Sequence, residues 1–171
     1  MPNHVINEVT VICGRERRAE VVRLIGTPER AVDFDVLLPT PLNYWRGSEG
    51  IRHKQTLKNM GMAWARENWG TKWNAYGEPK VELGDDCVRA TFQTAWSPPH
   101  GWLVALFNKT GSTVVYSSLS QGGFHAICGT FAPPKSDDDL MGPQWSEQDA
   151  SEAEHRRMHK LLWGVEEFDP A

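Results

Sequence analysis

The sequence predicts one α+β domain, in which an antiparallel sheet carries helices packed on one face. Its 171 residues are of single-domain size, and the 40% that are hydrophobic suffice to fill one core. Runs rich in Val, Ile and Thr alternate along the chain with segments whose apolar residues recur at helical spacing. Gly and Pro residues stand between these runs, where strands and helices are expected to end.

The N-terminal segments predict a strand, a helix and a second strand. Residues 5–13 are apolar in both phases, as expected of a strand in the centre of its sheet. Residues 15–25 have helical spacing, and Gly26 is a natural helix end. Residues 31–38 alternate apolar with polar side chains and stop at Pro39, which predicts a half-exposed strand.

The middle of the chain predicts two helices and two strands. A long helix is expected over residues 50–69, where one stripe is apolar and Gly70 provides the stop. Residues 71–76 alternate and suggest a short strand. The strongest strand pattern covers residues 88–96, and a helical turn is expected over residues 102–107.

The C-terminal third predicts a hairpin followed by a helix. Strands over residues 112–119 and 124–131 are separated by a Gly pair, which is typical of a hairpin turn. A helix over residues 146–163 opens with acidic side chains, which suit the N-terminal end of the helix dipole. Its inward face is expected to contain Ala150, Met158, Leu161, Leu162 and Trp163.

This order of elements contains the split β-α-β plan, so the predicted fold is ferredoxin-like with an added C-terminal helix. The domain is expected to occupy residues 1–132. A linker over residues 133–145 follows it, and an acidic helical segment, residues 146–171, is expected to pack on the same domain.

Composition argues against several classes of protein. Three widely spaced cysteines, Cys13, Cys87 and Cys128, predict neither a disulfide framework nor a zinc or iron–sulfur site. No apolar run has the length of a membrane helix, and the first residues lack a secretion signal. We therefore expect a cytoplasmic protein with no membrane partner.

Charge is distributed unevenly along the chain. The net charge is −4, with balances of +3 over residues 1–72, zero over residues 73–136 and −7 over residues 137–171. A bulk nucleic-acid binder usually has a basic excess, which this chain lacks. The acidic end is interpreted as a solubilising tail or as a segment that docks on a basic surface, its own or a partner's.

Two tryptophan-containing strings, residues 67–76 and 92–99, are distinctive. Together with residues 3–5 and the turn at 38–41, they resemble the YubB ferredoxin-like family, which consists of small proteins carried by phages and plasmids. The resemblance covers residues 3–131 and leaves out the acidic end. It implies the fold, a mobile-element origin and the cytoplasm of a bacterial host, but no established activity, cofactor or catalytic residue.

The same two strings supply the candidate binding residues. If residues 71–76 pair with residues 88–96, then Lys72, Asn74 and Trp96 share a cleft suited to an anionic, base-bearing ligand or an acidic peptide. The alternative is structural, with the indoles as core anchors and the Asn side chains satisfying turn backbone groups. The candidate set is Asn68, Lys72, Trp73, Asn74, Trp96, Ser97 and Trp102.

Other constellations favour solvated surface over chemistry. His155 and His159 share a helix face, but two adjacent Arg residues disfavour a cation and a metal site needs further ligands. The three consecutive acids at residues 137–139 lack the spacing of a calcium loop, and Ser97 has no nucleophile-elbow motif. No metal ligand, cofactor or catalytic residue is therefore named.

These observations lead to three hypotheses of function. The leading one is a non-enzymatic mobile-element protein that binds a host macromolecule, such as a defence protein, and interferes with it; the acidic end would aid association. The first alternative is a protein that binds or sequesters a small nucleotide-like ligand. The second is a single-stranded nucleic-acid binder that stacks bases on the sheet face.

Overall fold

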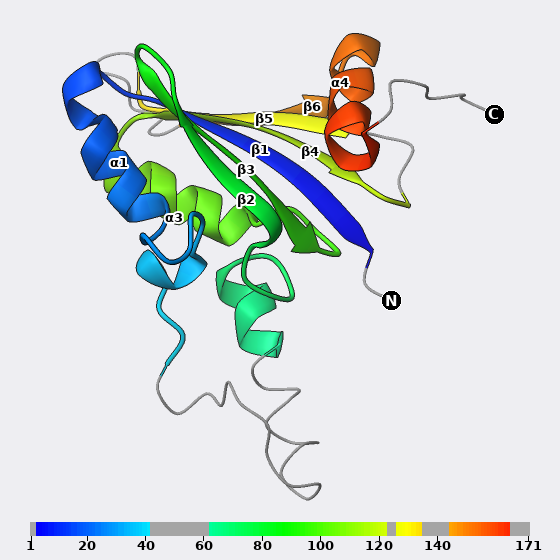
Figure 1. The fold of residues 1–171 in the computed structure, drawn as a ribbon, viewed down its shortest axis with the longest axis horizontal. Coiled ribbons are helices and arrows are strands. Elements are labelled where there is room, and N and C mark those ends of the chain that lie inside the picture. Colours follow the sequence, from blue (N-terminus) through cyan, green and yellow to red (C-terminus); the bar gives the residue numbers. More distant parts are fainter. Residues whose placement is uncertain (1–2, 42–61, 123–125, 135–143, 165–171) are drawn as a thin grey trace, which may run out of the picture.

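The computed structural model describes residues 3–41, 62–122, 126–134 and 144–164. Within them, six strands form one antiparallel sheet in the order β2-β3-β1-β4-β5-β6 (Figure 1). The strands are β1 (His4–Ile12), β2 (Tyr76–Leu83), β3 (Cys87–Ala95), β4 (Thr113–Ser120), β5 (Ala126–Ala132) and β6 (Gln144–Asp149).

The first four strands have the split β-α-β topology. Helix α1 (Arg18–Ile25), which a 3-10 turn η1 (Arg15–Arg17) precedes, follows β1, and helix α3 (His100–Thr110) connects β3 to β4. The resulting spatial order β2-β3-β1-β4 is that of a ferredoxin-like sheet. The predicted α+β class is confirmed, and β5 and β6 extend the sheet beyond β4.

Helices lie on both faces of the sheet (Figure 1). Helices α1 and α3 cover one face and enclose the main core, where Trp102 lies 5.0 Å from Phe34 and 5.7 Å from Phe92 between ring centroids. Helix α4 (Glu152–Trp163) covers part of the opposite face, where Met158 is fully buried against Ile6 of β1. Rings of this size bury 150–250 Å² each, so the aromatic cluster dominates the main core.

Several predicted elements are confirmed. The strands expected at residues 5–13, 88–96, 112–119 and 124–131 correspond to β1, β3, β4 and β5, and β1 is central, paired with β3 and β4. The helix expected at residues 15–25 corresponds to η1 and α1, and the expected turn at 102–107 is the longer helix α3.

The strand predicted at residues 31–38 is wrong. Val32 and Phe34 are fully buried, as their alternation predicts, but Phe34–Val36 form a 3-10 turn, η2. The side chain of Asp33 accepts a hydrogen bond from the Asp35 backbone N–H at 3.1 Å. Asn74 Oδ1 accepts one from the Phe34 N–H at 2.9 Å. Because side chains satisfy these backbone groups, the segment needs no strand partner.

The strand predicted at residues 71–76 is also wrong. Gly70 takes a left-handed conformation (φ 84°), residues 71–74 form bends, and strand β2 begins only at Tyr76. Strand β2 was missed because it is an edge strand whose side chains are largely exposed on both faces, with Pro79 inside it. Proline is tolerated at such an edge, because one backbone N–H there has no ladder partner.

The C-terminal segment begins with a strand and not with a helix. Residues 144–149, predicted as the end of the linker and the start of the helix, form the edge strand β6, which pairs with β5. The Ser151 side chain then accepts a hydrogen bond from the Glu154 N–H at 3.3 Å and caps α4. Of the predicted inward face, Met158 is buried, whereas Leu161 and Trp163 are exposed.

Some predictions lie outside the described residues. Of the helix expected at residues 50–69, residues 62–68 are described and are helical. Residue 69 is a turn, whereas residues 50–61 of that helix, residues 123–125 of the hairpin, linker residues 135–143 and residues 165–171 are not described. Within the described ranges, no helix combines the length and apolar character needed to cross a bilayer.

Candidate functional site

The two tryptophan-containing strings lie side by side at one end of the sheet. Thr71 Oγ1 donates a hydrogen bond to the Ala95 carbonyl at 2.9 Å, and Ser97 Oγ donates to the Gly70 carbonyl at 2.6 Å. The Tyr76 hydroxyl donates to the carbonyl of Thr94 at 2.9 Å. The predicted proximity is therefore confirmed, although a loop, and not a strand, brings residues 70–75 against the end of β3.

Lys72 lies between two exposed indoles. Its Nζ is 5.0 Å from the ring centroid of Trp73 and 5.7 Å from that of Trp96, within the range of cation–π interactions. Trp73 is 40% exposed and Trp96 is 54% exposed. Two large π-faces and one cation are thus presented to solvent within a single short stretch of surface.

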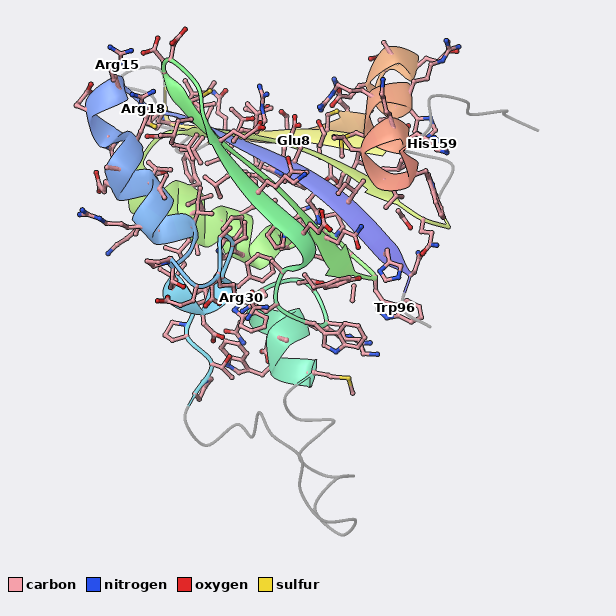
Figure 2. The ribbon with its side chains drawn as sticks, in the orientation of Figure 1. Glu8, Arg15, Arg18, Arg30, Trp96 and His159 are labelled. Atoms are coloured by element: carbon pink, nitrogen blue, oxygen red, sulfur yellow. The ribbon has the colours of Figure 1, made fainter. Side chains whose placement is uncertain are left out.

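Trp96 has an unusual backbone conformation. Its φ is 78°, and no other non-glycine residue among those described has a positive φ. A bulky residue with positive φ is an outlier. Such strain costs about 1–3 kcal/mol and persists only where neighbouring interactions impose it. The Trp96 N–H donates to the Asn3 carbonyl at 2.9 Å, and Thr94 Oγ1 donates to the Ser97 carbonyl at 2.8 Å. These bonds hold the indole outward near the N-terminal end of β1 (Figure 2).

His4 and Tyr76 complete the surface. His4 Nδ1 is 2.8 Å from the Tyr76 hydroxyl, the two rings meet edge to face at 5.6 Å, and Tyr76 packs edge to face on Trp73 at 6.2 Å. Since the hydroxyl proton goes to Thr94, His4 Nδ1 is the donor in this pair. Burial raises the pKa of Tyr76, so the phenol stays protonated. We call His4, Lys72, Trp73, Tyr76 and Trp96 the Trp96 surface.

The other predicted site residues serve the fold. Asn68 donates to the Trp64 carbonyl at 2.9 Å. Asn74 accepts from two backbone N–H groups and donates to Asp33 Oδ1 at 2.6 Å. Ser97 fastens Gly70, as described above. Trp102 is fully buried, and its Nε1–H has no hydrogen-bond acceptor within the described part of the chain.

Of the residues predicted to share a cleft, Lys72 and Trp96 lie together and are joined by Trp73, whereas the Asn74 side chain bonds backbone groups and Asp33. Sequence reasoning missed His4 and Tyr76. The residues of the His4–Tyr76 pair are 72 positions apart. No local pattern marks either residue, because it is the pairing of β1 with β3 and of β3 with β2 that brings them together.

The uncovered part of the sheet has a different character. Beside α4, a groove of about 570 Å³ runs over β2, β3 and β1. Phe92 borders the groove, but its ring is 1% exposed and packs into the core on the opposite face. A sheet that stacks single-stranded bases uses exposed aromatic rings, which this groove lacks among its lining residues. The charged side chains that line it are Glu8, Glu78, Lys80, Glu82 and Arg89.

The acidic C-terminal segment is largely paired where it is described. Residues 144–164 contain four of the ten acidic residues of this segment, together with three basic ones. Glu152 binds Arg156, and Glu154 binds Arg157 at 2.6 Å. Arg157 also bonds Glu8 of β1 at 2.9 Å, which ties α4 to the sheet. The acids of α4 are therefore paired within their own helix, and Arg157 provides the ion pair to the sheet.

The described residues contain no group of three or more His, Cys, Asp or Glu side chains placed to hold a metal ion. His155 is 7% exposed, while His159 contacts Trp163 at 6.3 Å between ring centroids. The three cysteines are free thiols, and burial raises the pKa of Cys13, which makes that thiol less reactive.

Comparison with models of protein families, with curated protein sequences and with solved structures yields no match. The resemblance to the YubB family consequently stays a prediction from the quoted strings.

Proposed function

We propose that this chain is a binding protein whose Trp96 surface takes up a ligand carrying an unstacked nucleobase and a phosphate. The observation that carries the proposal is the Lys72 ammonium between two exposed indoles, one of which a strained backbone holds outward. Neither feature serves the core, since both indoles are among the exposed large hydrophobic residues.

Base stacking supplies the main favourable contribution to the free energy of binding. A nucleobase stacked on an aromatic side chain contributes about 1–3 kcal/mol, whichever base it is. The Lys72 contacts with the indoles are worth about 0.5–1 kcal/mol at an exposed site, so a stacking base can displace them at a net gain. The displaced ammonium is then available to a phosphate next to the base.

The ligand is short. A net charge of −4 opposes association with a long polyanion, and this surface contributes one lysine. A free nucleotide and the end of a single strand share the same chemistry, and both fit a surface with two indoles. Sequestering either is compatible with a mobile-element protein in a bacterial cytoplasm, as the family resemblance implies.

A host-protein partner bound through the acidic end has less support. Three of the four described acids of that end, Glu147, Glu152 and Glu154, are engaged with Arg156, Arg157, His100 and Tyr116 of the same chain. Interference with a host macromolecule would therefore arise because this chain and the host macromolecule compete for the same nucleotide or strand.

Tryptophan fluorescence tests the proposal. Titration with mononucleotides and with a short oligothymidylate is expected to quench emission, and Trp96→Ala is expected to abolish most of the quenching. Lys72→Met should weaken binding and reduce its dependence on salt. Trp163→Ala is the matched control, because that indole is 48% exposed but lies on α4.

The two kinds of probe distinguish a free nucleotide from the end of a single strand as the ligand. Saturation by a mononucleotide identifies a free nucleotide, whereas binding of the oligothymidylate alone identifies a strand end. Absence of quenching with every probe, or quenching that survives Trp96→Ala, would refute the proposal.

A further inference from the structure

A pocket of about 490 Å³ lies between helix α3 and strands β5 and β6. The volume is within the range of small-molecule sites. Its lining comes from three separate elements, so it is a product of the tertiary fold. The lining residues are His100, Val104, Phe131, Trp145 and Glu147.

Glu147 provides the polar end of the pocket. Its Oε2 accepts hydrogen bonds from the Tyr116 hydroxyl and from His100 Nε2, the latter at 2.9 Å. A carboxylate only accepts and the Tyr116 proton is already used, so His100 Nε2 is a donor. The other oxygen, Oε1, has no hydrogen-bond partner among the described residues, and the side chain is 29% exposed. One carboxylate oxygen is therefore held in a fixed direction with its acceptor capacity unused.

The fold makes a specific provision for this arrangement. Tyr116, Gly129 and Glu147 are direct cross-strand neighbours on β4, β5 and β6. The Tyr116 ring lies over Gly129 to reach Glu147, and a Cβ on Gly129 would be 2.3 Å from the ring. Burial and the neighbouring Glu147 raise the pKa of Tyr116, which keeps the phenol a neutral donor. Glycine is thus required at this position by close approach, and not by its backbone angles.

The remaining walls are apolar. Trp145 stacks on Phe131 at 6.3 Å and 25° between planes, and Phe131 stacks on Tyr116 at 6.0 Å and 27°. Trp145 is nevertheless 59% exposed, and Val104 on α3 is 41% exposed. An indole face and an aliphatic side chain therefore stand open beside the carboxylate.

We propose that this pocket binds a small organic cation, an ammonium or guanidinium group on an apolar or aromatic body. The cation would bond Glu147 Oε1, and the body would lie against Val104 and Trp145. Charge complementarity supports this choice of ligand. The titratable lining residues are Glu147 and His100, the Tyr116 hydroxyl lies against both, and neither Lys nor Arg is among the lining residues. The indole face adds cation–π attraction, which an anion would not obtain.

The proposal differs from a purely structural role for Glu147. A clip that fastens β6 to α3 and β4 would account for the bonds at Oε2, but it requires neither the unused Oε1 nor the exposed Trp145. Stability measurements report the clip, whereas ligand titrations report the site. The site is also independent of the Trp96 surface, so each proposal can fail without the other.

The test is titration followed by two-dimensional amide and indole NMR. Phenethylamine is the probe, with phenethyl alcohol and 3-phenylpropanoate as neutral and anionic matches of similar shape. We expect saturable shifts at Val104 and at the Trp145 indole N–H with the amine, with binding about tenfold weaker for the alcohol. The anion should not bind.

Variants complete the test. Glu147→Gln keeps an acceptor but removes the charge and should weaken amine binding about tenfold. Glu152→Gln, at an exposed acid on α4 that does not line the pocket, is the control and should bind like the parent chain. Val104→Phe fills the pocket from an exposed helix position and should block binding with the fold intact. Equal binding of the amine and the alcohol, unchanged affinity in Glu147→Gln, or shifts that map away from the pocket would each overturn the proposal.

Discussion

The backbone strain at Trp96 leads to a prediction that links stability to binding. At φ 78°, a side chain with a Cβ is disfavoured, whereas glycine adopts this conformation freely. Trp96→Gly and Trp96→Ala both remove the indole, which is 54% exposed and contributes little to the core. The two variants differ in whether a Cβ remains at a left-handed position. The difference between their free energies of unfolding therefore isolates the strain.

The magnitude follows from two opposing terms. A left-handed conformation costs a residue with a Cβ about 1–2 kcal/mol. Glycine loses about 0.5–1 kcal/mol through the greater freedom of the unfolded chain. We expect Trp96→Gly to be more stable than Trp96→Ala by about 1 kcal/mol in urea unfolding. Both variants should lose nucleotide-dependent quenching.

A regular strand position provides the control. Arg89 on β3 has a side chain that is 48% exposed, and it lies in the paired part of the ladder. There Arg89→Gly should be less stable than Arg89→Ala by about 0.5–1 kcal/mol, the opposite sign. If Trp96→Ala is as stable as Trp96→Gly or more so, the backbone at residue 96 is not strained and the reasoning fails.

Three further predictions concern other parts of the fold. Gly129→Ala should lower the free energy of unfolding by about 3 kcal/mol in urea, because the added Cβ displaces the Tyr116 ring. The loss should be smaller in a Tyr116→Leu background, and an equal loss in both backgrounds would contradict this explanation. Asn74→Ala should cost about 2–3 kcal/mol, since two buried backbone N–H groups lose their acceptor, and a cost below about 0.5 kcal/mol would refute that role. The hydrogen bond from Arg157 lowers the pKa of Glu154, so this pair stabilises the fold above the ordinary glutamate pKa and the stabilisation is lost as pH falls through the lowered value. The free energy of unfolding of the parent chain and of Arg157→Gln, measured between neutral and acidic pH, tests this contribution. A parallel pH dependence in the two proteins would exclude a stabilising role of the pair.

The two proposed sites use different physical terms. The Trp96 surface relies on stacking and one lysine, and it therefore suits an anionic ligand with a π-face. The pocket at Glu147 relies on one carboxylate and an apolar wall, and it suits a cation. Because these preferences are opposite, a single panel of charged aromatic probes can assign each ligand class to its own site.

The sequence by itself determined the α+β class and the elements that are buried on at least one face. Strands β1, β3, β4 and β5 and helix α1 have apolar residues at a regular period, because each places those residues in a core. The sequence also predicted that the two tryptophan-containing strings lie side by side, although a loop at residues 70–75, and not the predicted strand, makes the contact with the end of β3. Lys72, Trp73 and Trp96 could therefore be named among the candidate site residues.

Only the tertiary structure decided the edges, the turns and the partners of polar groups. Strands β2 and β6 are exposed edges, so no burial period marks them in the sequence. Residues 31–38 have a strand-like alternation because a compact turn also buries every second side chain there, as Val32 and Phe34 show. The pairing of His4 with Tyr76, and of Tyr116 with Glu147 across Gly129, depends on which strands are neighbours. Local sequence patterns indicate the period at which side chains are buried. The partner of a given side chain is decided only when strands distant in the sequence come together.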